Sequence, residues 1–267
     1  MRLTFFLSLG LLLFILSNCS VSSKYVIRPT WRDEFNGSGS PNNAMWTRSV
    51  SELNDSYLSV FCDEDSNAYV RNGKLHLRVY KTDDPKKPYK AGRVIIKRNF
   101  NFKKGKLVVR AKAPITRGLW KAIWLNGPRT KDGYFAELDL MEHVHAQGDS
   151  CYTAVYHLWG DFGGKKQNHT SYGQSVPIAV DGWHIYTLEV TDDRIQMIVD
   201  GKLMYDIYKG KYGDEWPEDQ EYSLRIGMSY GGYGAQRDGI DDSALPAEML
   251  VDYVRFYELK RPKQGRK

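Results

Sequence analysis

The most constraining feature of this sequence is a period of two in its apolar residues, which runs from residue 30 almost to the end. Within residues 74–80, Leu75, Leu77 and Val79 fall on one face of an extended chain, while His76 and its polar neighbours fall on the other. The same pattern returns in nine further segments: 93–98, 105–113, 119–125, 137–144, 151–159, 183–190, 194–208, 222–230 and 249–257. No helical stretch, internal repeat or interdomain linker interrupts them. The pattern predicts one all-β domain, an antiparallel sandwich or barrel.

The net charge belongs to the ends of the chain and not to this domain. The 38 Lys and Arg exceed the 32 Asp and Glu by six, and six basic residues are Arg2 and five members of the tail 260–267. The body is therefore neutral, whereas binding to nucleic acid needs a basic folded surface. An aromatic content of 13% is typical of β proteins and of sugar-binding sites. We expect one domain over 30–259, a monomeric protein and no nucleic-acid partner. We expect the basic tail over 260–267 to be solvated, with contact to an acidic surface as the alternative.

The N-terminus has the pattern of an export signal. Arg2 precedes the apolar run 3–16, which is shorter than the roughly 20 residues of a membrane span but suits a secretory signal. The run ends in the letters LSNC, which resemble a bacterial lipobox with Cys19 as its lipidated residue. We expect a signal peptide over 1–18, a tether over 19–29 and a cell-envelope lipoprotein, at the outer membrane or cell surface, that touches the membrane only through its lipid anchor. A plain signal peptide cut nearby is the alternative.

Three carboxylates lie close together in the segment 137–142, whose sequence is ELDLME. On a strand, Glu137 and Asp139 share one face and the leucines between them share the other. Strict alternation would turn Glu142 to the wrong side, but a β-bulge near Met141 would restore it. Two carboxyl groups about 5–5.5 Å apart are what a retaining glycosidase needs. A solvated strand face and a calcium site are the alternatives.

Several ordered blocks beside this segment resemble glycoside hydrolase family 16, in the bulged form of its laminarinase-like members. The resemblance implies a jelly-roll sandwich of two curved antiparallel sheets with a concave substrate cleft. The blocks are WRDEF at 31–35, the segments 102–114 and 118–125, WHIY at 183–186 with VDG at 199–201, and LVDYVRFY at 250–257.

Carried over by position, the resemblance implies that Glu137 is the nucleophile, Glu142 the general acid/base and Asp139 their electrostatic partner. It also implies a set of substrate-binding residues around the cleft: Trp120, Trp124, Tyr134 and His157. For the two tryptophans, a place in the core is the alternative.

Two further acids match positions around a calcium site that many members of this family carry away from the cleft. These are Glu34 and Asp252, so the resemblance also implies a structural calcium ion, whereas catalysis needs no cofactor. Cys62 and Cys151 either form a disulfide or are two buried small side chains, and the sequence does not decide between them.

Departures from the family pattern concern the walls of the cleft, and with them the substrate. Ala136 stands before the first glutamate where Gly is usual, Gly227 replaces an Asn, and Gln236 replaces a Trp. The run 141–145 resembles members from gut bacteria that act on host O-glycans. We therefore expect an endo-β-galactosidase acting on chains of the poly-N-acetyllactosamine type, with an endo-β-1,3-glucanase as the alternative. A non-catalytic lectin on the same sandwich is the alternative from another class.

Overall fold

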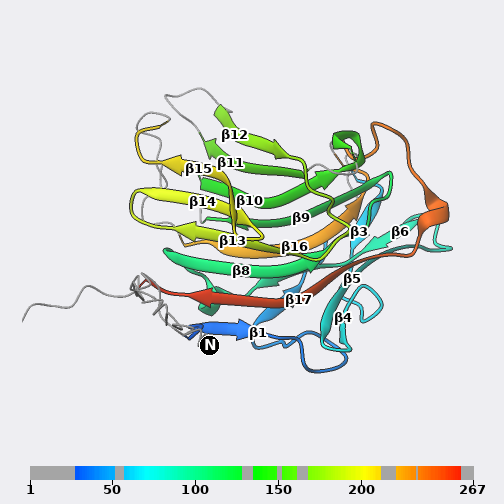
Figure 1. The fold of residues 1–267 in the computed structure, drawn as a ribbon. Helices are drawn as coiled ribbons and strands as arrows, with labels where there is room; N and C mark the ends of the chain where they lie inside the picture. The colour runs from blue at the N-terminus through cyan, green and yellow to red at the C-terminus, as the bar shows by residue number, and fades with distance from the viewer. Residues whose placement is uncertain are drawn as a thin grey trace, which may run out of the picture.

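The computed structural model describes residues 28–51, 57–127, 135–148, 152–160, 168–211, 221–232 and 234–259. These residues form two curved β-sheets that pack face to face, as Figure 1 shows. The predicted all-β class and jelly-roll sandwich are confirmed. The helices in the described ranges are three short 3₁₀ turns: Arg98–Phe100, His145–Gln147 and Asp242–Ala244. None of them has the length and apolar content that crossing a bilayer demands.

The larger sheet has ten strands and packs against the smaller sheet, which carries the carboxylate segment. Its path is β15-β14-β13-β8-β17-β5-β6-β3, with β1 paired to β17 and β4 to β5. Its pairings are antiparallel except that of β3 with β6. The strands are β1 (Trp31–Asp33), β3 (Ser59–Phe61), β4 (Ala68–Arg71), β5 (Lys74–Lys81), β6 (Tyr89–Ala91), β8 (Gly105–Lys112), β13 (His184–Val190), β14 (Arg194–Val199), β15 (Lys202–Tyr208) and β17 (Ala247–Tyr257).

The smaller sheet has seven strands in the order β12-β11-β10-β9-β16-β7-β2 and carries the carboxylate segment near its centre. Along β9, buried and half-buried residues alternate without a break. Ile123 and Leu125 enter the core shared by the two sheets, whereas Trp120 and Trp124 face outward. The strands are β2 (Trp46–Arg48), β7 (Arg93–Ile96), β9 (Leu119–Asn126), β10 (Phe135–Val144), β11 (Tyr152–Gly160), β12 (Asn168–Val176) and β16 (Ser223–Tyr230).

The turn between β14 and β15 follows directly from its sequence. Asp200 and Gly201 have φ values of 51° and 78°, the left-handed conformation that a tight two-residue hairpin requires. An Asp-Gly pair between the two alternating halves of the segment 194–208 predicts such a hairpin from the sequence alone, and the structure confirms it. By contrast, the alternation pattern gave no signal for β12, whose sequence NHTSYGQSV is mostly polar and has its one aliphatic residue, Val176, at the end. β12 is the last strand in the order of its sheet, where one neighbour is sufficient to form it.

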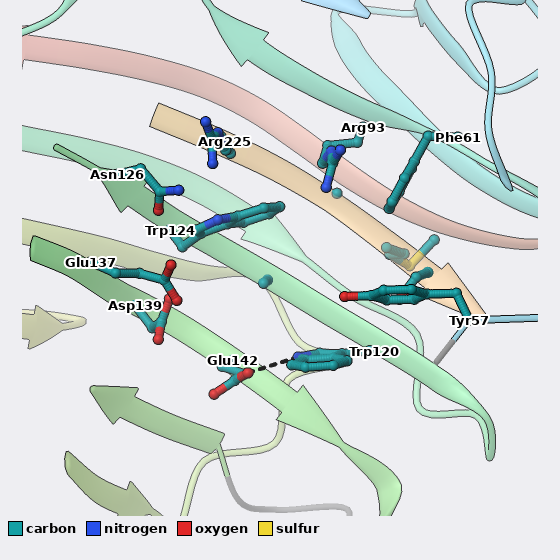
Figure 2. Close-up of a pocket in the computed structure, with 14 residues that line it drawn as sticks. Tyr57, Phe61, Arg93, Trp120, Trp124, Asn126, Glu137, Asp139, Glu142 and Arg225 are labelled. Carbon is teal, nitrogen blue, oxygen red and sulfur yellow. Dashed lines mark hydrogen bonds between the residues drawn. The ribbon is translucent and has the colours of Figure 1, made fainter. Parts of the chain in front are cut away.

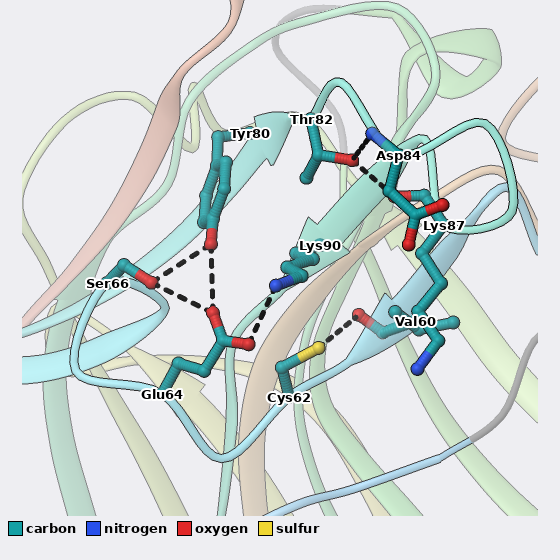
Figure 3. A network of polar contacts seen from close by, with 9 residues as sticks. All are labelled: Val60, Cys62, Glu64, Ser66, Tyr80, Thr82, Asp84, Lys87 and Lys90. Atoms are coloured by element: carbon teal, nitrogen blue, oxygen red, sulfur yellow. Dashed lines mark hydrogen bonds and ion pairs between the residues drawn. The ribbon is translucent and has the colours of Figure 1, made fainter.

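Cys62 is a free cysteine that lies next to a network of polar contacts around Glu64 (Figure 3). Its sulfur lies 4.0 Å from the carbonyl oxygen of Val60, and burial raises the pKa of the thiol. Glu64 accepts hydrogen bonds from Lys90 at 2.7 Å and from Tyr80 at 3.1 Å. Cys62 is thus a protonated, partly buried side chain at neutral pH.

Several predictions fall outside the described residues and stay predictions. They are the signal peptide 1–18, nearly all of the tether 19–29 with lipidated Cys19, Cys151, and the tail 260–267.

Candidate active site

A bulge in β10 decides which way Glu142 points. Opposite β9, Asp139 pairs with Trp124 and Met141 pairs with Ile123, so two residues of β10 stand against one of β9. The pairing of β10 with β11 shifts at the same place, between Asp139 and Glu142. The bulge predicted near Met141 is therefore confirmed.

The bulge brings all three carboxylates to one cavity. Leu140 and Met141 are both buried in the core, which returns Glu142 to the outer face. Glu137, Asp139 and Glu142 line a cavity of about 260 Å³, and Figure 2 shows them side by side along β10. The walls add the rings of Tyr57, Phe61, Trp120 and Trp124 and the polar groups of Arg93, Asn126 and Arg225.

Asp139 is the most deeply buried of the acids, with 4% of its surface exposed. Burial raises the pKa of its carboxyl from 3.8 to about 7, because a charged carboxylate is poorly solvated there. Near neutral pH a large share of Asp139 is thus protonated. A protonated carboxyl adds no third negative charge between the glutamates and has a hydrogen to donate.

Glu142 is held by an indole. The Nε1–H of Trp120 donates a hydrogen bond to Oε1 of Glu142 at 2.8 Å. The Trp120 ring stacks on Tyr57 with 6.3 Å between centroids. Gly232 makes this packing possible, since a Cβ there would stand 2.6 Å from the Trp120 ring. The contacts fix both the ring and the carboxylate that it holds.

Glu137 is held from the neighbouring strand. In the amide orientation that satisfies both partners, the Asn126 nitrogen donates to Oε2 of Glu137 at 3.1 Å, and its oxygen accepts from Arg225. Asn126 pairs directly with Glu137 in the register of β9 and β10. The chain Arg225–Asn126–Glu137 therefore orients one carboxylate, as Trp120 orients the other.

Comparison with known proteins agrees with this geometry. The family model of glycosyl hydrolases family 16 matches residues 56–255, which is well over half of the chain. The chain belongs to glycosyl hydrolases family 16. It is therefore a glycoside hydrolase, and the lectin alternative is set aside.

Proteins with similar chains are named for different glycans. The laminarinase of Rhodothermus marinus superposes with a TM-score of 0.78 at 27% identity, covering 89% of this chain and 99% of that one. A structure of endo-acting O-glycanases that initiate mucin breakdown, from prominent members of the human gut microbiota, has a TM-score of 0.74 at 27% identity and covers 90% and 93%. The keratan-sulfate endo-1,4-beta-galactosidase of Sphingobacterium multivorum is 30% identical over 86% of this chain and 54% of its own. All three are named for cleaving a glycan, and two of them are named as endo-acting.

The two acids predicted to bind calcium in this family-16 chain each form an ion pair with an arginine. Both carboxylate oxygens of Glu34 accept from Arg255, at 2.8 and 2.7 Å, and Asp252 accepts from Arg110 at 2.6 Å. No group of three or more His, Cys, Asp or Glu in the described ranges is placed to hold a metal ion. These contacts do not fit a calcium site at Glu34 and Asp252, so we assign no role to calcium there.

Among the predicted substrate-binding residues, Trp120 and Trp124 line the cavity and are not core residues. The backbone of His157 pairs with that of Glu137 across β10 and β11, while its side chain lies outside what the structure describes. Tyr134 lies outside the described residues as well.

The cavity residues that were not predicted from the sequence include Tyr57, Phe61, Arg93, Asn126 and Arg225. For Asn126 a signal was available, since it continues the outward series of Trp120 and Trp124 along β9. The others come from strands or loops distant in sequence, and only the sheet order brings them to the acids.

Proposed function

We propose that this family-16 enzyme is a retaining endo-β-glycosidase in which Glu137 is the nucleophile and Glu142 the general acid/base. The observation that carries the proposal is the bulged strand, which sets three carboxylates in one cavity between aromatic walls. Retaining hydrolysis requires two carboxyl groups that flank the scissile bond about 5–5.5 Å apart, with one of them protonated.

In the proposed reaction, Glu142 donates its proton to the glycosidic oxygen while Glu137 attacks the anomeric carbon. The bond to the leaving sugar breaks, and a covalent glycosyl-enzyme forms. Glu142 then takes a proton from water, which attacks the same carbon and releases Glu137. Asp139, held neutral by burial, donates a hydrogen bond as charge shifts between the two glutamates.

Stereochemistry tests this function directly. Proton NMR during digestion should show the β-anomer of the new reducing end first, with the α-anomer appearing only through mutarotation. Product masses should show internal cleavage, with chains of intermediate length released early. The α-anomer as first product, or single sugars released from one end, would contradict the proposal.

For substrate, we propose galactose-containing chains of the poly-N-acetyllactosamine type, supported by the similarity to the galactosidase and the O-glycanases. An endo-β-1,3-glucanase is the second candidate, supported by the similarity to the laminarinase. Digestion of keratan-type chains, mucin O-glycans, laminarin and mixed-linkage glucan under one set of conditions separates the two. Activity confined to the glucans would overturn the first candidate.

Replacing Trp120 with Phe should reduce kcat by roughly ten- to a hundredfold, the effect of losing one hydrogen bond to a charged group. The ring is kept, so stacking on the sugar should change little. Trp124→Phe is the matched control, because no hydrogen bond joins Trp124 to the acids in the described chain, and its effect should appear mainly in KM. Equal losses of kcat in both variants would contradict the role given to Trp120.

Activity should decline as pH rises through about 7, because ionised Asp139 adds a negative charge between the glutamates. Asp139→Asn cannot gain this charge, so its alkaline decline should differ in position from that of the wild type while measurable activity remains. Complete pH–rate profiles of both proteins provide the measurement, and an identical alkaline limb in the variant would contradict the assignment.

The proton on the Asp139 carboxyl also makes the free energy of unfolding depend on pH. The folded state holds it up to about pH 7, whereas the unfolded chain releases it near 3.8, so the stabilising contribution is complete below 3.8 and lost by about 7. Across this window the wild type should lose stability relative to Asp139→Asn, by at most ~1.4 kcal/mol per pH unit. Denaturant unfolding at pH 4 to 8 measures the difference.

A further inference from the structure

One side of the cleft carries two arginines that take no direct part in the proposed reaction, although Arg225 bonds to the Asn126 that orients Glu137. Arg93 on β7 pairs with Gly227 on β16, which pairs in turn with Ala122 and, through it, with Glu142. Arg93 therefore lies three strands from Glu142, roughly 14 Å across the sheet at ~4.8 Å per strand. Arg225 lies between them on β16, and both side chains line the cavity with the acids (Figure 2). A sugar one or two units from the cleaved bond would lie over them.

The Arg93 side chain is held in place by its surroundings. Its guanidinium lies over the Phe61 ring at 3.9 Å and donates to Oγ of Ser49 at 2.6 Å. Gly227 leaves the space for it, since a Cβ at that position would stand 2.8 Å from Cβ of Arg93. The departure from the family pattern at Gly227 thus makes room for the base of the Arg93 side chain.

The positive charges of these arginines are incompletely balanced within the protein. Among the described residues, neither Arg93 nor Arg225 forms an ion pair, whereas Arg255 and Arg110 each contact a carboxylate. Burial lowers the pKa of both cleft arginines, and repulsion from Arg225 helps to lower that of Arg93 to about 10. Glu137 offsets part of the charge of Arg225. The Nε of each guanidinium is buried without a hydrogen-bond partner. Such groups gain most from an anion with several oxygens.

Beyond Arg225 the cleft opens into a second hollow, where basic side chains again outnumber acidic ones. This hollow, of about 610 Å³, shares Asn126 and Arg225 with the first. Its other charged residues are Arg98, Lys103 and Glu221. A chain crossing the sheet from the acids past Arg225 therefore meets a path with more positive than negative side chains.

We propose that this side of the cleft binds an anionic substituent of the glycan, a sulfate ester or a carboxylate, within a unit or two of the cleaved bond. Planar guanidinium groups bind such oxygens through paired hydrogen bonds, and neutral hydroxyls gain less from them. The inference rests on the proposed function, because it concerns the same cleft and adds the charge class of its substrate.

Binding to Glu142→Gln, which slows turnover and leaves Glu137 beside Arg225, tests the proposal by calorimetry. One matched pair is keratan sulfate oligosaccharides before and after desulfation. A second is sialylated N-acetyllactosamine oligosaccharides before and after removal of the sialic acid, and a third is sulfated and plain laminarin oligosaccharides. We expect the anionic member of at least one pair to bind on the order of ten- to a hundredfold more tightly. Preference in a sulfated pair alone identifies the sulfate ester, and preference in the sialylated pair alone identifies the carboxylate.

Substitutions of the two arginines test whether these side chains cause the preference for anionic glycans. Arg93→Met and Arg225→Gln in the same background should each bring the two affinities of a pair together, and Arg93→Lys should keep part of the difference. Lys202→Gln removes the same charge from the start of β15 on the other sheet and should leave the ratio unchanged.

Equal affinities in every pair would overturn the proposal, and so would a preference that survives both arginine substitutions. The first outcome is read from unsubstituted arginines, so a poorly folded variant does not obscure it. If the wild type releases no reducing ends from any glycan but the anionic preference persists, the proposed function fails while the anion site stands.

Discussion

Glu137→Gln is expected to reduce hydrolysis by on the order of 10⁴-fold or more, because no other group in the cavity can form the covalent intermediate as effectively. Glutamine has the same shape and still accepts the hydrogen bond from Asn126, so the fold and the binding of sugar should persist. The loss should therefore fall on kcat. Release of reducing ends under saturating glycan measures it, and trapping with a fluorosugar should label the wild type alone.

A matched control is Glu189→Gln, a glutamate on β13 of the other sheet, which should keep wild-type activity. If Glu137→Gln folds and retains a tenth or more of the wild-type kcat, Glu137 is not the nucleophile.

Glu142→Gln should behave differently, since a general acid matters in proportion to how poor the leaving group is. With a natural glycan the expected loss is about 10²- to 10⁴-fold, the range for removing one general acid/base. With a dinitrophenyl glycoside, whose leaving group needs no proton, formation of the intermediate should be nearly normal and its hydrolysis slow. A burst of dinitrophenol followed by a slow steady rate would report this separation.

Added azide distinguishes the two glutamates. It should accelerate the second step in Glu142→Gln and give a glycosyl azide of retained, β configuration, since azide needs no general base. A product of inverted configuration, or equal losses with natural and activated substrates, would contradict the acid/base role of Glu142.

The sequence was sufficient to predict β10 because every part of the signal is local. The leucines and acids of 137–142 alternate, and the misplacement of Glu142 in that alternation itself called for a bulge. The same reasoning predicted the Asp200-Gly201 turn, whose backbone angles depend on two adjacent residues. By contrast, β12 has no apolar alternation, and it forms because β11 supplies a ladder of hydrogen-bonding partners.

The arginines show where local reasoning ends. Nothing within a few residues of Arg93 marks it as a cleft residue, since RVII reads only as a strand with one charged end. Its place beside Trp124 depends on β7 lying next to β16 and β16 next to β9, strands that are far apart in the chain. The two acids of the calcium prediction show a second limit of the sequence. Glu34 and Asp252 match family positions around a calcium site, but their partners in the structure are Arg255 and Arg110.

The sequence by itself determined the all-β class, the bulged strand and the identity of the three acids, since alternation and short-range spacing encode them. Only the tertiary structure decided which groups surround those acids. Trp120 holds Glu142, Asn126 holds Glu137, and the cationic side of the cleft is built by two arginines. The physical reason is that strand order sets these contacts and burial sets the charge state of Asp139. Both are properties of the folded sheets and not of any segment alone.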